Sequence, residues 1–483
     1  MIFEIQAERS ATDKKTFFYD NVTNTIKDDA GNVFEYPKEQ QKPSTKKAIV
    51  FSKDEPLHKS RKVKMVKIQL GLSCNYSCSY CSQRFVERAP ETNKKDIDNF
   101  MELFDNLEFD EQTGLKIEFW GGEPFVYWKT LKPLAEAIQE RFADWKKPPR
   151  FSVVTNGSIL TKEICQWLMY MGFSVGVSHD GPGQFVRGPD PLDDPEKKKV
   201  LLDFYKKMRP LGRMSFNAML HNKNRSRKEI HKFFTELTGD ENVRLGEGGI
   251  VDAYDDDGIE NSLQTKQDHF DYRKLAFNDI RETEGNIGFV GILDKINNFM
   301  RDVLSHKNAE TTPQKCGMDD PEIVAIDLRG NVITCQNVSA VETAMNGESH
   351  HVGNLSDFDN VEIKSATHWS KRQDCADCPS LHICKGACMF LDGKYWTSSC
   401  NNAYSDTISL FALAFEKITG YIPVYINNDH LPAERRDIWG TVLKHEETPK
   451  KKIIPIKIVS EKNMVVDGIE VFEKAKITEI TEG

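Results

Sequence analysis

Three closely spaced cysteines are the residues of this chain best suited to chemistry. Cys74, Cys78 and Cys81 follow an apolar segment with the spacing C-x3-C-x2-C. Three thiolates at this spacing can bind three irons of a [4Fe–4S] cube and leave the fourth iron open to a substrate. The same spacing could place three small residues on one face of a buried helix. Polar residues interleaved with the cysteines favour a loop, so the triplet predicts an iron–sulfur site.

A second group of seven cysteines lies between residues 316 and 400. They are Cys316, Cys335, Cys375, Cys378, Cys384, Cys388 and Cys400. In a large chain without a secretion signal, clustered cysteines indicate metal binding or redox work more than disulfides. Paired cysteines also suit tetrahedral zinc, and seven could hold one zinc with a remainder or two with a borrowed ligand. The remaining cysteine, Cys165, lies in an amphipathic helical turn and is expected to be a core residue.

The length and composition are those of a large globular protein. A chain of 483 residues exceeds what one core usually supports, which predicts two or three domains. No apolar run approaches the roughly 20 residues of a membrane span. The first residues lack a basic start followed by an apolar stretch, so we expect a cytoplasmic protein without a membrane partner. A net charge of −9 makes nucleic acid a poor partner.

The elements that must position the triplet begin at Met65, where short apolar runs alternate with helical stretches. This alternation indicates repeated β/α units. Candidate helices include 130–142 and 198–208, and the expected strands are Met65–Leu70, Leu115–Trp120, Phe151–Thr155, Phe173–Ser178, Met214–Leu220 and Val243–Leu245. The predicted fold class is α/β, a partial (β/α)6 TIM-type barrel. In such barrels the loops after the strands carry the active site, and the triplet lies in the first of them.

Three further strand ends carry polar motifs. Residues 120–125, Trp-Gly-Gly-Glu-Pro-Phe, follow the second strand, and the two glycines allow a close backbone approach to a ligand. Thr155-Asn156-Gly157 ends the third strand, and Ser178-His179-Asp180-Gly181-Pro182 ends the fourth, with Arg187 soon after. Singly, each motif is more typical of an ordinary turn. Their shared position after successive strands favours a binding site.

The triplet, the aromatic Tyr80 before its last cysteine, and Gly121-Gly122-Glu123-Pro124 together resemble the radical S-adenosylmethionine superfamily over roughly residues 63–282. The resemblance implies that the three cysteines hold a [4Fe–4S] cluster whose open iron binds the amino and carboxylate groups of S-adenosylmethionine. Cleavage of that sulfonium yields a 5′-deoxyadenosyl radical. The cofactor-binding residues that the resemblance implies are Tyr80, Gly121, Gly122, Glu123, Pro124, Asn156, Ser178, Asp180 and Arg187.

The second cysteine group is similar to the SPASM extension of this superfamily, which binds two auxiliary [4Fe–4S] clusters. The resemblance implies one cluster at Cys316, Cys335 and Cys388, and another at Cys375, Cys378, Cys384 and Cys400. Seven ligands leave one position of the first cluster to a non-cysteine group or to the substrate. Asp319, Asp320 and Glu322 are near in sequence, where a solvated acidic turn is the simpler interpretation. The expected cofactors are therefore S-adenosylmethionine and three [4Fe–4S] clusters.

The sequence predicts that the chain divides into four regions. Residues 1–62 are a β-rich region and connector that caps the barrel or offers a sheet edge to an extended peptide. Residues 63–282 are the barrel, and 283–449 are the cluster domain, with a helix expected over 405–419. Residues 450–483 are a strand-rich tail with a hairpin around Asp467-Gly468, expected to pair with another sheet such as the N-terminal one.

Enzymes with a SPASM extension oxidise peptide side chains. By this resemblance the leading hypothesis is a maturase that modifies or crosslinks side chains of a ribosomally synthesised precursor peptide. We expect a low-potential donor such as flavodoxin or ferredoxin to supply electrons to this enzyme. Alternatives are oxidation of a free small molecule, sulfatase-maturase-like formylglycine formation, and a zinc-stapled or cluster-bearing binding module without turnover.

The catalytic base is left open by the sequence. Sulfatase-maturating relatives have an Asp directly after the second cysteine of the auxiliary group, whereas Gln336 and Asn337 follow Cys335 here. This difference disfavours formylglycine formation. Glu247 and Asp327 are candidate replacements, although Asp327 is more simply a turn residue before Gly330.

Overall fold

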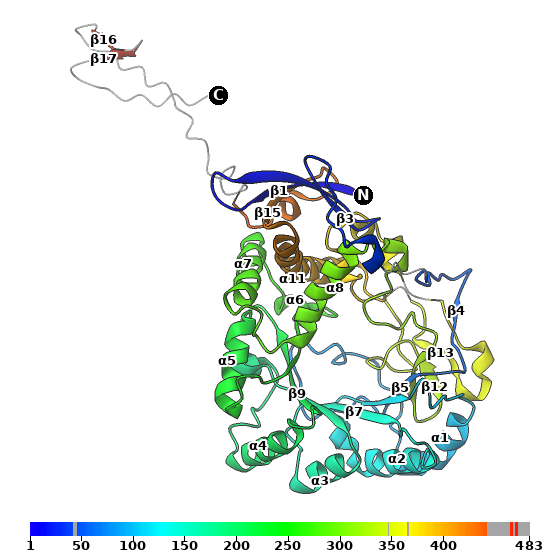
Figure 1. The fold of residues 1–483 in the computed structure, drawn as a ribbon. Helices are drawn as coiled ribbons and strands as arrows, with labels where there is room; N and C mark the ends of the chain where they lie inside the picture. The colour runs from blue at the N-terminus through cyan, green and yellow to red at the C-terminus, as the bar shows by residue number, and fades with distance from the viewer. Residues whose placement is uncertain (42–45, 346, 365–366, 442–463, 467–468, 472–483) are drawn as a thin grey trace. The chain divides into compact units, whose positions relative to one another are not determined.

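A nine-stranded sheet is the centre of this computed structural model (Figure 1). Its strand order is β10-β9-β8-β7-β6-β5-β11-β12-β13, and the strands from β10 to β5 are parallel. These six are β5 (Met65–Gln69), β6 (Lys116–Trp120), β7 (Arg150–Thr155), β8 (Ser174–Ser178), β9 (Met214–Leu220) and β10 (Leu245–Ile250). The partial (β/α)6 barrel expected from the sequence is therefore confirmed.

The structure describes residues 1–41, 46–345, 347–364, 367–441, 464–466 and 469–471. Residues Met1–Trp439 form one compact unit, and residues Gly440–Gly483 form another. The domain boundaries predicted at residues 62, 282 and 449 stay predictions. None of the helices in the described ranges is long and apolar enough to cross a bilayer.

Amphipathic helices follow the barrel strands and cover the outer face of the sheet (Figure 1). They are α1 (Ile97–Phe104), α2 (Trp128–Arg141), α3 (Lys162–Tyr170), α4 (Pro195–Met208) and α5 (Arg227–Thr238). Side chains that cap the helix N-terminus determine where α3 and α4 begin. Thr161 accepts a hydrogen bond from the Ile164 amide at the start of α3, and Asp194 caps α4. Their apolar faces pack on the strands, so the helices fix the strand ends in place.

The last barrel strand differs from its prediction. We expected Val243–Leu245, whereas β10 spans Leu245–Ile250 and pairs with β9. Its sequence, Leu-Gly-Glu-Gly-Gly-Ile, is rich in residues that disfavour strands, so propensity gave no signal. Pairing with β9 overrides this composition. The strand end therefore lies five residues later than expected.

The chain returns to the barrel sheet after a long excursion. β11 (Ile323–Asp327) pairs in parallel with β5, and β12 (Asn331–Ile333) and β13 (His351–Asn354) extend the edge in antiparallel. The Asp327 carboxylate accepts hydrogen bonds from the amides of Arg329 at 2.8 Å and Asn331 at 3.0 Å. Gly330 between them has a φ of 77°, which favours glycine. Asp327 is thus the turn residue that the simpler interpretation predicts.

The N-terminal sheet has four strands rather than a local meander. β1 (Ile2–Glu8), which the sequence analysis missed, pairs with β2 (Lys14–Asp20) and with β15 (Ile422–Asn427), and β3 (Thr25–Asp28) completes the sheet. Segments that follow closely in sequence lie along both edge strands of this sheet, β3 and β15. The Phe34 amide donates to Ile26, and the Ile438 amide donates to Val424. These contacts disfavour the addition of a peptide strand at either edge.

Helix α11 (Gly393–Thr419) joins the N-terminal sheet to the rest of the unit (Figure 1). Phe17 and Tyr19 of β2 contact Phe415 and Phe411 of α11, with ring centroids 5.2 and 5.4 Å apart. The helix packs against α7 (Lys266–Glu282) and α8 (Val290–Leu304). It begins 12 residues before the predicted 405–419, because its first half buries polar residues that conceal the helical pattern.

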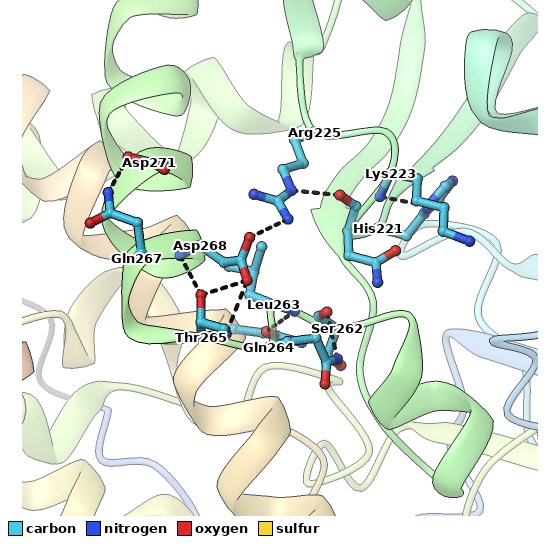
Figure 2. A network of polar contacts seen from close by, with 12 residues as sticks. His221, Lys223, Arg225, Ser262, Leu263, Gln264, Thr265, Gln267, Asp268 and Asp271 are labelled. Carbon is cyan, nitrogen blue, oxygen red and sulfur yellow. Dashed lines mark hydrogen bonds and ion pairs between the residues drawn. The ribbon is translucent and has the colours of Figure 1, made fainter.

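Figure 2 shows how helix α7 begins. Thr265 is the N-cap: its hydroxyl accepts from the Asp268 amide at 3.0 Å, and the Asp268 carboxylate accepts from the Thr265 amide at 3.0 Å. Arg225, in the loop after β9, donates to Asp268 at 2.6 Å and to the Asn222 carbonyl at 2.6 Å. This network ties a loop at the active-site end of the barrel to the helix that supports α11.

The connector before the barrel is held by its basic residues. The buried Lys59 ammonium donates to the carbonyl oxygens of Met318, Asp320 and Ile323 at 2.8, 3.0 and 2.9 Å. β4 (Leu57–His58) pairs with β14 (Glu362–Ile363). The connector thus contacts the segment that follows Cys316.

In the second unit, β16 (Met464–Val466) pairs with β17 (Ile469–Val471), which confirms the two strands of the expected hairpin. The turn residues 467–468 lie outside the described part. β16 and β17 form a two-stranded sheet, and the fourth strand of the N-terminal sheet is β15. The expectation that the tail pairs with another sheet, such as the N-terminal one, stays a prediction.

Candidate functional site

The cysteine triplet lies in the loop after β5 and lines a cavity of about 410 Å³. Cys74, Cys78 and Cys81 all contribute to this cavity, which also receives the loops after β6, β7, β8 and β10. A volume of this size is typical of small-molecule and cofactor sites. Burial raises the pKa of the Cys78 thiol to about 11, so metal binding must displace its proton.

The two glycines after β6 allow the cysteine loop to lie against them. A Cβ added to Gly122 would lie 2.5 Å from the carbonyl oxygens of Leu72 and Ser73. The Glu123 amide donates to the Ser73 carbonyl at 3.0 Å, and the Gly122 amide donates to Gly71 at 3.1 Å. The glycines were expected to admit a ligand, and their first role is to position the backbone directly before Cys74.

Glu123 is buried, with 1% of its surface exposed, and its carboxylate lies in the cavity wall. It accepts hydrogen bonds from the Phe125 amide at 3.1 Å, the Thr155 hydroxyl at 2.7 Å and the Asn156 amide at 2.7 Å. Burial raises its pKa, and these donors partly offset that effect. A carboxylate held in this way can still accept a hydrogen bond from an ammonium group.

Asn156 connects the loop after β7 to the cysteine loop. Its amide nitrogen donates to the Asn75 side chain at 2.9 Å, and Asn75 donates to the Ser158 hydroxyl at 2.8 Å. Asn156 also lines the cavity, as does Ser178 at the end of β8. Both predicted residues are therefore next to the triplet.

Tyr80, Arg187 and Asp180 form one network. The Tyr80 hydroxyl donates to Asp180, Arg187 donates to the Tyr80 oxygen at 2.7 Å, and Arg187 lies 3.5 Å from the Asp180 carboxylate. Tyr80 and Arg187 line the cavity. Asp180 is fully buried and also accepts from the Met219 amide at 3.0 Å. It holds the wall residues in place, and the buried Pro124 begins the short helix η3 (Pro124–Tyr127) behind them.

The chemistry of this cavity fits the expected cofactors. Three thiols form one wall, and Glu123 and Arg187 supply a carboxylate and a guanidinium to the same cavity. Opposite charges of this kind suit the ammonium and carboxylate groups of an amino acid such as the methionine part of S-adenosylmethionine. The residues present therefore fit an open-iron cluster with that ligand.

Four of the seven later cysteines surround a second, mainly apolar cavity. They are Cys375, Cys378, Cys384 and Cys400, and Arg435 lines the same cavity. Short helices α9 (Gln373–Ala376) and α10 (Leu381–Cys384) carry two of them, and α11 carries Cys400. Arg435 donates to the Cys400 sulfur at 3.3 Å. The set assigned to one auxiliary cluster is thus brought together.

The other three cysteines, Cys316, Cys335 and Cys388, are also neighbours. Burial, with smaller contributions from the nearby Cys335 and Cys316 thiols, raises the pKa of the Cys388 thiol to about 12. The Asn337 amide donates to the Cys335 sulfur at 3.4 Å. Of the acidic residues after Cys316, Asp320 pairs with Lys64 at 2.5 Å, as a structural turn would.

In the described ranges, no three His, Cys, Asp or Glu side chains are close enough to hold one metal ion. The cysteines instead lie around the walls of the sites described above.

Several cavity residues were missed from the sequence. Asp252 and Tyr254 follow β10, and Asn337 follows Cys335, and all three line the first cavity. Asp252 pairs with Lys315 at 3.6 Å. Asp252 and Tyr254 could have been found from their position directly after a barrel strand. We expected β10 to end at Leu245, so this position was not recognised. Of the two base candidates, Asp327 serves a turn, and the side chain of Glu247 lies outside the described part.

Comparisons with known proteins agree with this geometry. The radical SAM cyclopropyl synthase TigE of Paramaledivibacter caminithermalis is 23% identical over 365 residues, which cover 69% of each chain. The serine-type anaerobic sulfatase-maturating enzyme of Bacteroides thetaiotaomicron is 32% identical over 127 residues, 25% of this chain and 30% of that enzyme.

The solved structure of native anSMEcpe with bound AdoMet and Cp18Cys peptide shares the fold, with a TM-score of 0.50 and 18% identity. The match covers 74% of this chain and 99% of that one. The family model of the Radical SAM superfamily matches residues 68–234, which contain the triplet and all four strand-end loops from β5 to β8. Residues 68–234 are thus the part of this chain that is similar to the Radical SAM superfamily.

Proposed function

We propose that this radical SAM enzyme oxidises side chains of a ribosomally synthesised peptide and forms a thioether or carbon–carbon bond. The observation that carries the proposal is the first cavity, whose wall combines the cysteine triplet with Asn337, and the Asn337 amide donates a hydrogen bond to the Cys335 sulfur. A substrate in this cavity lies between a site that starts radical chemistry and a site that can take up an electron. The anSMEcpe structure of the same fold holds a peptide, which supports a peptide substrate.

When bound, S-adenosylmethionine and the triplet's [4Fe–4S] cluster supply a 5′-deoxyadenosyl radical that removes one hydrogen atom from the substrate. Glu123 would accept hydrogen bonds from the ammonium group of the bound cofactor, and Arg187 would donate to its carboxylate. Tyr80 and Asp180 hold Arg187 in that position. Asp252 takes the proton that leaves as the new bond forms, and an oxidised iron–sulfur cluster held by Cys316, Cys335 and Cys388 would take up the electron, so the product has two hydrogens fewer.

The experiment is performed anaerobically with a reductant such as flavodoxin or dithionite. We expect release of 5′-deoxyadenosine, which is lost in Cys74→Ala and Cys78→Ala variants, while Cys165→Ala keeps it. Coexpression with a short peptide encoded beside the enzyme should give a peptide lighter by two hydrogens. Persistent release from the triplet variants contradicts the assigned cluster site.

The alternatives give different results in the same preparations. Three cubes predict about twelve irons per chain, whereas stoichiometric zinc would support a binding module. An unchanged peptide together with an oxidised metabolite would support a small-molecule substrate. A carbonyl gained at a serine or cysteine of the peptide would support the sulfatase-maturase-like activity that Gln336 and Asn337 disfavour.

A further inference from the structure

We propose that the Arg435 guanidinium raises the reduction potential of a cluster bound by Cys375, Cys378, Cys384 and Cys400. Arg435 lines the cavity that these four cysteines surround, and its Nη2 donates to the Cys400 sulfur at 3.3 Å. The inference rests on the proposed function, because it needs a cluster at these cysteines. It goes beyond the ligand set, since it assigns the side chain that determines how readily this site accepts an electron.

The Arg435 guanidinium is a buried positive charge, in a residue of which 9% of the surface is exposed. Besides the Cys400 sulfur, it bonds the Asn401 side-chain oxygen at 2.9 Å. In the described part of the chain, no Asp or Glu side chain forms an ion pair with Arg435. Asp374, which also lines the cavity, accepts from the Trp396 indole instead, at 3.3 Å. A buried cation without an anionic partner is costly, so the cavity is suited to an anion.

A second buried guanidinium lies close by. Arg273 of α7 is 2% exposed, and the guanidinium carbons of Arg273 and Arg435 lie 5.1 and 4.9 Å from the centroid of the Tyr404 ring. Arg273 donates to the Ser405 hydroxyl at 3.2 Å and to the Glu434 carbonyl at 2.9 Å, which are both uncharged groups. Two buried cations beside one ring repel each other, and a negative charge at the four cysteines offsets this repulsion.

A thiolate-bound [4Fe–4S] cluster would supply that negative charge. Four thiolates leave the bound cube with a net negative charge, and the one electron added on reduction makes it more negative. A nearby cation that also donates to a ligand sulfur therefore stabilises the reduced form more than the oxidised form. Loss of the guanidinium should make reduction of this site less favourable.

The backbone around Arg435 is fixed by contacts that do not use its side chain. Arg435 lies in the short helix α12 (Ala433–Arg436), and its carbonyl accepts from the Tyr404 hydroxyl at 2.6 Å. Arg273 donates to the Asp437 carbonyl at 3.2 Å. Both bonds join α11 or α7 to the main chain, so substitution of the Arg435 side chain leaves them in place.

The test compares Arg435→Gln and Arg435→Lys in the reconstituted full-length enzyme. A Cys74→Ala/Cys78→Ala/Cys81→Ala background leaves the two auxiliary signals, and adding Cys375→Ala/Cys378→Ala removes the signal of this site and so identifies it. Titration with dithionite, followed by electron paramagnetic resonance, gives each midpoint potential. We expect Arg435→Gln to lower the equilibrium constant for reduction of this site about tenfold or more, which is about 59 mV for one electron. Arg435→Lys, which keeps the charge, should stay closer to the unsubstituted background.

The matched control is Arg436→Gln, which removes a positive charge from the same short helix. Arg436 pairs with Asp429 at 3.3 Å, outside the residues that line the cavity. This variant should move neither auxiliary potential. An unchanged potential in Arg435→Gln, an equal shift at both auxiliary sites, an equal shift in Arg436→Gln, or loss of iron from this site in both Arg435 variants would overturn the inference alone.

Failure of the proposed auxiliary site gives a different result. Absence of iron at the four cysteines of the otherwise unchanged enzyme would overturn that site and this inference together. Triplet-dependent release of 5′-deoxyadenosine would then still support the radical chemistry.

Discussion

Asp252 places a carboxylate in the wall of the cavity that contains the cysteine triplet. Its partner, Lys315, lies 3.6 Å away and belongs to the segment that leads to Cys316. A carboxylate in the cavity wall is within reach of a substrate bound there, where it can act as a general base. The side chain is therefore suited to take the proton that bond formation releases.

Asp252→Asn is expected to separate the two halves of the reaction. Release of 5′-deoxyadenosine should stay close to wild type, because the variant leaves the triplet and its neighbours intact. Formation of the modified peptide should fall about 100-fold or more, as for loss of a general base. Liquid chromatography with mass spectrometry measures both products in one assay.

Asp98→Asn, at an exposed position of α1, is the control and should change neither product. A variant in which both products fall equally would show that Asp252 acts on cofactor binding rather than on the proton.

Single residues with a local pattern could be predicted from the sequence, and others could not. Glu123 and Asn156 were found because each directly follows a recognisable strand. Asp252 and Tyr254 were missed because a glycine-rich strand precedes them, and its pairing with β9 is a tertiary effect. Tyr254 and Cys388 pack against one apolar cluster although 134 residues of sequence separate them, and spacing alone does not contain this proximity.

Among the elements, the loop after β6 acts on the loop after β5 through the backbone. Gly122→Ala would place a Cβ 2.5 Å from two carbonyl oxygens of the cysteine loop, which is closer than atoms can approach. The loop must move, and the three thiols lose their common geometry. We expect the variant to bind about four irons fewer per chain than wild type.

Gly291→Ala, in α8, is the matched control, because nothing lies within 4 Å of its added Cβ. It should keep the wild-type iron content. Iron and sulfide analysis after anaerobic reconstitution measures the difference, and equal iron in both variants would contradict the positioning role of Gly122.

Helix α7 should show a pH-dependent contribution to stability through Asp268 (Figure 2). Hydrogen bonds from Thr265 and Arg225 lower the pKa of Asp268 from 3.8 to about 2. Because the folded pKa is below the unfolded one, this stabilisation is present above pH 4 and is lost as the pH falls toward 2. Asp268→Asn should cost about 1–2 kcal/mol of unfolding free energy at pH 7, and progressively less as the pH falls from 4 through 2.

Thermal unfolding of iron-free protein at pH 7, 4 and 3 measures this difference without a contribution from cluster loss. Asp271→Asn, one turn later on the exposed side of α7, is the control (Figure 2). A constant difference between Asp268→Asn and wild type at all three pH values would contradict the assigned pKa.

The elements with strong periodicity were predictable, whereas those that depend on distant partners were not. β5 to β9 and α2 have apolar patterns that their local sequence fixes. β1 and β15 pair across more than 400 residues, and the first half of α11 buries Ser399 and Asn402 to bind the loop after β10. A polar residue that is buried because it bonds a distant partner looks, in the local sequence, the same as an exposed polar residue.

At the scale of the molecule, a buried ion pair joins the barrel to the helix that carries Cys400. Arg227 of α5 is fully buried, lies 2.5 Å from Asp406 of α11, and donates to the Gly248 carbonyl at 2.8 Å. The Tyr272 hydroxyl of α7 donates to the same carboxylate at 2.6 Å. The barrel, α7 and the auxiliary region therefore share one polar network.

Arg227→Met leaves Asp406 buried without its main partner and should cost about 3–5 kcal/mol of unfolding free energy. Asp406→Asn keeps an acceptor for Tyr272 and should cost less. The double variant should lose less than the sum of the two single variants, because neither charge is then left alone. Chemical denaturation under anaerobic conditions measures these values.

An exposed pair provides the comparison. Lys228→Met, which removes the surface pair with Glu282, should lower the free energy of unfolding far less than Arg227→Met does, because solvent screens an exposed pair. Additive losses in the Arg227 and Asp406 variants would show that the two residues are not energetically coupled.

The pairing of β1 with β15 has a consequence for the synthesis of this protein. The partner of Glu4 is Asn427, so the first strand emerges from the ribosome long before its neighbour exists. At typical translation rates this interval is roughly 20–80 s, and contacts of such long sequence separation also form slowly. The unit can therefore close only after almost all of it has been made. The early cysteine loop stays accessible during this interval, and chaperones have the same interval in which to bind β1.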